Sequence, residues 1–172
     1  MRSSAASDVY KRQTTSCTHT LLFETGGDIL TPENREKYKQ LKIMDITQWL
    51  KEVVLPRIKV IRPKNRILLH PTCSCQIMGL TPVLLDIARK CAREVILPDN
   101  WGCCGASGDR GFIFPELSDS ATRDERDEIG HESFDGCYSL ARTCEIAMQD
   151  HIEQPYESIV YLVDETIQDQ GT

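Results

Sequence analysis

The chain has 172 residues, of which 40% are hydrophobic and 27% are charged, and its formal net charge is −6. A length of this order accommodates one domain and an extension. The acidic balance argues against nucleic-acid binding, which requires a basic surface. No stretch reaches the roughly 20 apolar residues that a membrane-spanning helix needs. The composition therefore predicts an ordinary globular domain, with no membrane span and no nucleic acid as a partner.

The cysteine content narrows the class further. The chain has eight cysteines, and no apolar segment follows Arg2 to form a secretory signal peptide. Cysteine-rich chains in a reducing compartment use their thiols for metal binding or redox chemistry rather than for disulfides. We therefore expect a cytoplasmic location, or peripheral attachment at the inner face of the membrane. A secreted, disulfide-bonded domain is the alternative.

The N-terminal third is expected to contain one clear helix. Residues 1–13 are polar and lack periodicity, which indicates a non-native or disordered extension. From Ile46 to Val54 the apolar residues recur at helical spacing, and Pro56 ends the pattern. Asp45 directly precedes this stretch and is a suitable N-cap. The pattern therefore predicts a helix over residues 46–54.

From residue 67 onward, short apolar runs alternate with amphipathic stretches. Predicted strands cover residues 67–70, 94–98, 137–142 and 158–163, and predicted helices lie within 77–91 and from 144 onward. The acidic segment 115–136 is interpreted as a solvated helical excursion. The alternation predicts an α/β fold with a small, mainly parallel sheet flanked by helices and an N-terminal helical extension. The expected divisions are residues 1–13, 14–62 and 63–172.

The motif that carries the most chemistry is Trp101-Gly102-Cys103-Cys104-Gly105. Adjacent Cα atoms lie about 3.8 Å apart, below the roughly 4.4–6.8 Å range of unstrained disulfides, so the two thiols are unsuited to bonding with each other. Cys73 and Cys144 each follow a predicted strand, as the cysteine pair does, and ligands of parallel sheets gather at the carboxyl ends of strands. The four cysteines therefore predict a thiolate site for iron–sulfur or zinc.

Four nearby residues are candidates for supporting such a centre. Gly102 and Gly105 permit a tight turn whose N–H groups would point at the sulfurs. Arg110 would offset the thiolate charge, or else pair with Asp109 or with an acidic residue of the segment 115–136. His70 is a candidate ligand, or a neighbour that donates a hydrogen bond to the site.

The remaining cysteines receive other interpretations. Cys91 lies on an apolar helical stripe and is expected in the core, where a free thiol behaves as a small hydrophobe. Cys75 is expected to point away from the site of Cys73, with coordination as the alternative.

Several segments around these cysteines resemble a known family. They are His70-Pro71-Thr72-Cys73, residues 102–112 (GCCGASGDRGF), Pro115-Glu116-Leu117, residues 142–146 (RTCEI) and residues 158–163 (SIVYLV). They resemble the cysteine-rich CCG domain at the C-terminus of long FAD-linked, iron–sulfur-containing D-lactate or D-2-hydroxy-acid dehydrogenases. Related CCG domains occur in the glycolate oxidase iron–sulfur subunit and in heterodisulfide reductase B-type subunits. The resemblance covers nearly all of the chain from Thr14 to Asp164.

The resemblance implies an electron-transfer domain at residues 63–172, preceded over 14–62 by the tail of an earlier CCG repeat with Cys17 as its last ligand. FAD and a ferredoxin-like domain would belong to the N-terminal part of the parent enzyme. Electrons would pass through an iron–sulfur cluster of the 4Fe–4S type to a quinone, a cytochrome or another acceptor. The family pattern ends in Cys-x-x-Cys, whereas Ala141 stands three residues before Cys144. That departure leaves four thiolates rather than five, with Cys137 as a candidate for a displaced fifth.

Two further interpretations remain open. Four thiolates could hold one zinc ion in a structural or docking domain without a redox role. Alternatively, Cys103 or Cys104 would act as the attacking thiolate in thiol–disulfide exchange. The chain contains no Walker A motif, no Gly-x-Gly-x-x-Gly fingerprint, no His-Glu-x-x-His motif and no convincing Ser-His-Asp set. It is therefore not expected to be a complete catalyst on its own.

Overall fold

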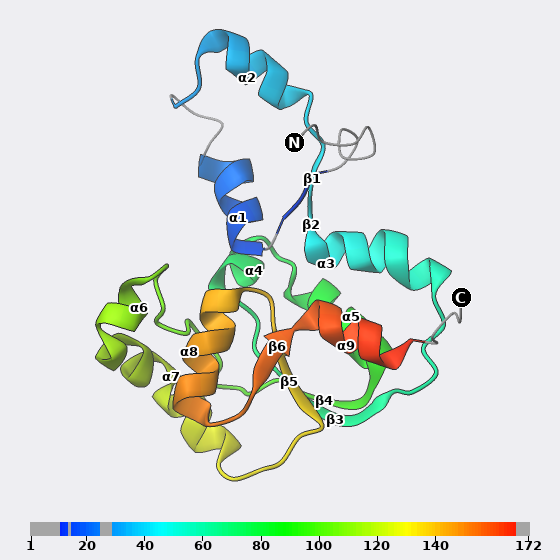
Figure 1. The fold of residues 1–172 in the computed structure, drawn as a ribbon, viewed down its shortest axis with the longest axis vertical. Helices are drawn as coiled ribbons and strands as arrows, with labels where there is room; N and C mark the ends of the chain where they lie inside the picture. The colour runs from blue at the N-terminus through cyan, green and yellow to red at the C-terminus, as the bar shows by residue number, and fades with distance from the viewer. Residues whose placement is uncertain (1–10, 14, 25–28, 168–172) are drawn as a thin grey trace.

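The computed structural model describes residues 11–13, 15–24 and 29–167, and it has an α/β architecture (Figure 1). Its main sheet has four parallel strands in the order β4-β3-β5-β6. The strands are β3 (Lys64–Leu69), β4 (Ala92–Ile96), β5 (Gly136–Ser139) and β6 (Tyr156–Ser158). The predicted fold class, a small parallel sheet flanked by helices, is confirmed.

The order of the strands places a change of direction at the centre of the sheet. The chain leaves β3 to form β4 on one side, then crosses to form β5 on the other side of β3. Leu68 of β3 is paired with Ile96 of β4 and with Cys137 of β5. In open parallel sheets, a crevice forms where two adjacent strands send their following connections in opposite directions. The crevice lies at the carboxyl ends of those two strands. The end of β3 beside the end of β5 is therefore the place where this fold offers a site.

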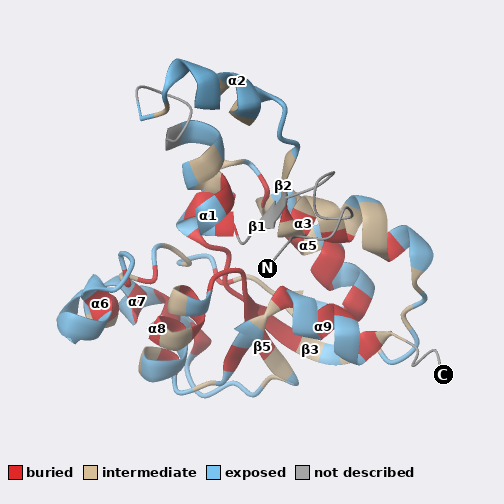
Figure 2. Ribbon diagram, turned by 45° about the horizontal axis from the view of Figure 1, so that its top comes forward, coloured by how far each residue is buried: buried red, intermediate tan, exposed pale blue. Residues whose placement is uncertain are grey.

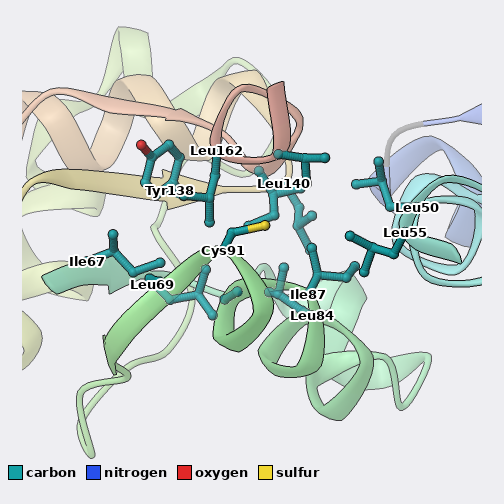
Figure 3. Packing of buried hydrophobic residues seen from close by; sticks show 14 of the residues in the cluster. Leu50, Leu55, Ile67, Leu69, Leu84, Ile87, Cys91, Tyr138, Leu140 and Leu162 are labelled. Atoms are coloured by element: carbon teal, nitrogen blue, oxygen red, sulfur yellow. The ribbon is translucent and has the colours of Figure 1, made fainter. Parts of the chain in front are cut away.

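One face of the sheet is covered by helices α5 (Thr81–Cys91) and α9 (Ile159–Thr166) (Figures 1 and 3). Leu84 and Ile87 of α5 and Leu162 of α9 are fully buried against the odd-numbered side chains of β3. Each such side chain stabilises the fold by about 1.5–3 kcal/mol relative to exposure. This core also receives Leu50 from the N-terminal part of the chain.

The other face is covered by α7 (Pro115–Ile129) and α8 (Arg142–Ile152). Leu68 points to this side of β3 because side chains alternate along a strand, and it packs with Ile129 of α7 and Met148 of α8. Cys104 and Cys144 belong to this second core. Figure 2 shows the buried residues concentrated between the sheet and its two helical layers.

The N-terminal part forms a smaller unit in which β1 (Lys11–Gln13) and β2 (Ile43–Asp45) pair in parallel. Its helical elements are α1 (Thr15–His19), a π-helical turn (Thr20–Glu24), α2 (Pro32–Lys39), α3 (Ile46–Trp49), a second π-helical turn (Leu50–Val54) and a 3₁₀ turn (Leu55–Arg57). Two short helices, α4 (Cys73–Ile77) and α6 (Arg110–Ile113), complete the described structure. No helix among the described residues has the length and apolar character needed to cross a membrane.

The predicted helix over residues 46–54 is confirmed, together with its N-cap. The Asp45 side chain accepts a hydrogen bond from the Thr47 N–H at 2.9 Å, and the Gln48 side chain returns to the Asp45 N–H in a capping box. The two-stranded sheet that precedes this helix was not predicted. The expected extension over 1–13 lies mainly outside the described residues, and its last three residues form β1.

The predicted strand over residues 158–163 is wrong beyond its first residue, because β6 ends at Ser158 and residues 159–163 form the N-terminal part of helix α9. The Ser158 side chain caps the helix by accepting a hydrogen bond from the Val160 N–H. Ile159, Leu162 and Val163 are buried, whereas Val160 and Tyr161 are exposed. This i, i+3, i+4 spacing is helical, but the β-branched residues in the run favoured a strand.

The predicted helical stretch 77–91 also differs in detail. Gly79, with φ of 68°, separates α4 from α5, since a glycine adopts the left-handed conformation that ends a helix.

Candidate metal centre

The four cysteines predicted to form one site lie at the carboxyl edge of the main sheet. Cys73 is the first residue of α4, Cys103 and Cys104 lie in the loop after β4, and Cys144 is the third residue of α8. The Cys104 and Cys144 sulfurs are 2.9 Å apart. The Cys103 thiol interacts with those of Cys73 and Cys104. The four thiols therefore form a continuous row of side-chain contacts, although the first and the last are 71 positions apart in the sequence.

The four sulfur atoms of the row do not surround a single point in this structure. Among the described residues no three His, Cys, Asp or Glu side chains converge closely enough to hold a metal ion. Two thiolates on a tetrahedral zinc with bonds of about 2.3 Å lie about 3.8 Å apart, which is more than the distance between Cys104 and Cys144. The sulfurs would have to move apart to accept an ion or a cluster. The donor set itself, four thiols at one edge, fits an iron–sulfur cluster or zinc.

Backbone N–H groups point at three of these sulfurs. The Gly105 N–H donates to the Cys103 sulfur at 3.4 Å. The Ala106 N–H donates to Cys104 and the Ser74 N–H donates to Cys73, and both bonds lower the pKa of the thiol they reach. Such donors stabilise negative sulfur, so the turn supplies the N–H groups that the sequence predicted around Gly105.

Other influences nevertheless raise the pKa of three of these thiols in the metal-free chain. The hydrogen bond with Cys103 lowers the pKa of Cys104, but its contact with Cys144 and its burial raise the net pKa to about 12. The hydrogen bond with Cys104, followed by burial, raises the pKa of Cys103 well above its ordinary value. Burial and then the proximity of Cys103 raise the pKa of Cys73. A metal must therefore displace protons to bind here.

The shape of the double-cysteine turn depends on Gly105. Its φ is 74°, and a Cβ at this position would lie 2.6 Å from the Leu117 carbonyl oxygen and 2.7 Å from the Ser118 Cα. The turn is therefore wedged against the backbone of α7. Gly102, by contrast, has open space around it and no positive φ, so it is not required for the shape of the turn.

Glu128 on α7 anchors the loop that leads to the cysteines. Its carboxylate accepts hydrogen bonds from the N–H groups of Asp99 and Asn100 at 2.7 and 2.8 Å, which lower its pKa. The sequence interpretation treated this acidic segment as a solvated excursion. The structure shows that α7 packs on the sheet and buries Ser118, Thr122 and Ile129, with acidic side chains used for tethering.

A second acidic residue of α7, Glu125, is buried and contacts His70. The His70 Nδ1 atom lies 2.9 Å from Glu125 Oε2, and the exposed fractions of the two side chains are 1% and 2%. His70 follows β3 directly, at the same edge as the four thiols. Nothing in the sequence identified Glu125, because one buried glutamate cannot be distinguished within a run of acidic residues.

The other predicted site residues and cysteines are placed as follows. Arg110 is exposed at the start of α6, and within the described chain no ion pair joins it to Asp109 and no hydrogen bond joins it to the thiols. Cys91 is fully buried in the first core, as predicted, and Cys75 is buried in the same core. Cys137 is buried on β5 in the second core, and burial raises its pKa to about 12.

Cys17 lies outside the row of four thiols but occupies a comparable local position. It is the third residue of α1, which follows β1, just as Cys144 is the third residue of α8, which follows β5. The neighbouring Ser16 hydroxyl lies 3.0 Å from the Ser74 hydroxyl. The N-terminal unit therefore contacts α4 next to Cys73.

Comparison with known proteins returned no match to this chain, either among protein-family models or among curated proteins. The geometry of the four thiols is thus the principal evidence on function.

Proposed function

We propose that this chain is an iron–sulfur electron-transfer domain, a C-terminal part of an FAD-dependent dehydrogenase of the D-lactate or D-2-hydroxy-acid type. The observation that carries the proposal is the row of four thiols, with Cys104 and Cys144 in direct contact at 2.9 Å. Thiolates are the ligands of iron–sulfur clusters. The motif around them resembles the CCG domain of that enzyme family.

In this proposal the cluster supplies the capacity to accept and release one electron at a time. The contribution of the chain is to hold it through Cys73, Cys103, Cys104 and Cys144, and to tune it. The N–H groups of the turn stabilise negative sulfur, and the burial of two of the four thiols limits contact with water. Flavin and ferredoxin-like domains would deliver the electrons, and a quinone or cytochrome on the cytoplasmic side would receive them.

The proposal is tested by purifying the chain without oxygen and measuring iron, acid-labile sulfide and zinc together. We expect a brown protein with several irons and sulfides per chain, and a centre that is reversibly reduced in a redox titration. Zinc near one equivalent, without visible absorption, would support the structural zinc site instead. A colourless chain that binds no iron after reconstitution would refute the electron-transfer function.

Matched variants identify the ligands. Cys104→Ala and Cys144→Ala are expected to lose the cluster, because each removes a thiol from the row. Cys91→Ala is the control, since Cys91 is fully buried in the first core and remote from the row. Equal iron content in all three variants would contradict the assignment of the ligands.

A further inference from the structure

The second core contains a polar pair that the thiol row does not use. His70 Nδ1 lies within 3.1 Å of both carboxylate oxygens of Glu125. The other ring nitrogen, Nε2, is buried and has no hydrogen-bond partner among the described residues. Leaving a buried polar atom unpaired destabilises a fold, so the unpaired Nε2 requires an explanation.

His70 faces the layer that contains the thiols. Its backbone N–H continues the ladder by donating to the Tyr138 carbonyl at 2.9 Å, so its side chain points to the same side of the sheet as Leu68, two residues earlier. Leu68 packs in the same core as Cys104 and Cys144. Glu125 is one helical turn beyond Ala121, whose side chain abuts Gly105 in the double-cysteine turn. The pair therefore lies in the same layer as the buried end of the thiol row, on the side of the sheet that α7 covers.

The charge of the pair determines which role Nε2 can take. A buried pair without net charge is far less costly than one that buries an unbalanced carboxylate. An imidazolium beside a carboxylate buries no net charge, and both of its ring nitrogens carry a hydrogen. A neutral ring that donates from Nδ1 to the carboxylate would instead leave Nε2 as a bare acceptor. The electron-rich sulfurs of a metal centre favour the first arrangement, because they attract the cation and accept its hydrogen bond. In that arrangement Nε2 is the donor.

We propose that His70, oriented by Glu125, donates a hydrogen bond from Nε2 to a sulfur of the metal centre at Cys104 and Cys144. This inference rests on the proposed function. His70 is thus a positioning residue rather than a ligand. A hydrogen bond to sulfur stabilises the more negative, reduced state of a cluster, so it raises the reduction potential.

The first test uses protein labelled with ¹⁵N-histidine, with its centre reduced and examined by pulsed EPR. We expect a weak nitrogen coupling, transmitted through a hydrogen bond, which disappears in His70→Gln. His151→Gln is the matched control, since His151 is a partly buried histidine on α8 beside Asp119, and it should keep the coupling. A strong coupling typical of direct nitrogen ligation would overturn the donor role. So would the absence of any coupling in the wild-type chain, a result that does not depend on how a variant folds.

The second test measures the reduction potential. His70→Leu is expected to lower it, and His70→Gln is expected to restore part of the loss because its amide can donate. An unchanged potential in His70→Leu, with the cluster content of the wild type, would overturn this inference and leave the proposed function intact. A chain without iron would overturn both.

Discussion

Three glycines of the double-cysteine loop provide a graded test of how α7 fixes the turn. Gly102 has no positive φ, and a Cβ added there would have no neighbour within 4 Å. Gly108 has a φ of 75° with open space, and Gly105 has a φ of 74° with three close neighbours. Substitution of each by alanine separates conformational strain from packing. The three positions lie within seven residues of one another.

The expected magnitudes follow from these differences. An alanine in the left-handed region costs roughly 1–2 kcal/mol, partly offset by about 0.4–1 kcal/mol from the reduced entropy of the unfolded chain. Gly108→Ala should therefore lower the free energy of unfolding by about 1 kcal/mol. Gly105→Ala adds overpacking against the backbone of α7, which costs about 1–3 kcal/mol more. Gly102→Ala should leave stability unchanged or raise it by about 0.5 kcal/mol.

Urea denaturation of the reduced, metal-free chain measures all three variants, with a common m-value as the check that only stability changed. Because Cys103 and Cys104 precede Gly105 directly, Gly105→Ala should also weaken binding of Zn²⁺ relative to Gly108→Ala. Equal stability of Gly105→Ala and Gly108→Ala would refute the close packing of the turn on α7.

Three further predictions concern the loop anchor, the last helix and metal loading. Glu128→Gln should lower the free energy of unfolding at pH 7 by about 1 kcal/mol, by weakening the hydrogen bonds from residues 99 and 100. The pKa of Glu128 is lower in the folded chain, so its stabilisation is complete above the unfolded pKa of about 4.3 and disappears as the pH falls through the folded value. A wild-type and a variant acid-unfolding curve that stay parallel down to pH 3 would contradict this. Ser158→Ala should cost about 1 kcal/mol through loss of the N-cap of α9, whereas Ser120→Ala, on an exposed site within α7, should not destabilise; a loss in both would refute the capping role. Zn²⁺ added to the reduced chain in weak buffer should release about four protons per ion, because four thiols must ionise; two or fewer would show that the row does not act as one site.

The sequence was most informative where one physical signal dominated. The apolar run of β3 and the helical spacing of α5 predicted the layered α/β core, because burial on both faces of a parallel strand leaves a nearly continuous apolar run, as at Ile67, Leu68 and Leu69. The last element was mistaken because Ile159, Val160 and Val163 are β-branched, and a short apolar run satisfies strand and helix patterns equally. Only the N-cap at Ser158 distinguishes them, and serine is common in both settings.

The grouping of the thiols was predictable for a related reason. Cys73 and Cys144 follow strands that are adjacent in a parallel sheet, so their carboxyl ends necessarily meet. The two α7 side chains that hold the surroundings of the site, Glu125 and Glu128, were not predictable in this way. Glu125 and Glu128 lie in an acidic run in which each residue looks like a solvated side chain. Their roles depend on the rotation of α7 about its axis, which is set by packing on the sheet rather than by local sequence.

The N-terminal unit repeats part of the geometry of the main sheet. Cys17 follows β1 at the start of α1, just as Cys144 follows β5 at the start of α8. β1 and β2 pair in parallel with Gln13 opposite Asp45, as β5 and β6 pair with Ser139 opposite Ser158. Asp45 and Ser158 each cap the helix that follows.

Within the described chain this unit has no counterparts of β3, β4 and α7, the elements that bring Cys73, Cys103 and Cys104 to Cys144. A single strand followed by a helix, such as β1 and α1, places only one thiol at its carboxyl end. In the main sheet, β4 and β5 lie on opposite sides of β3, and the segments that follow these three strands bring four thiols together. The chemistry of the site therefore depends on the sheet topology more than on any single cysteine motif.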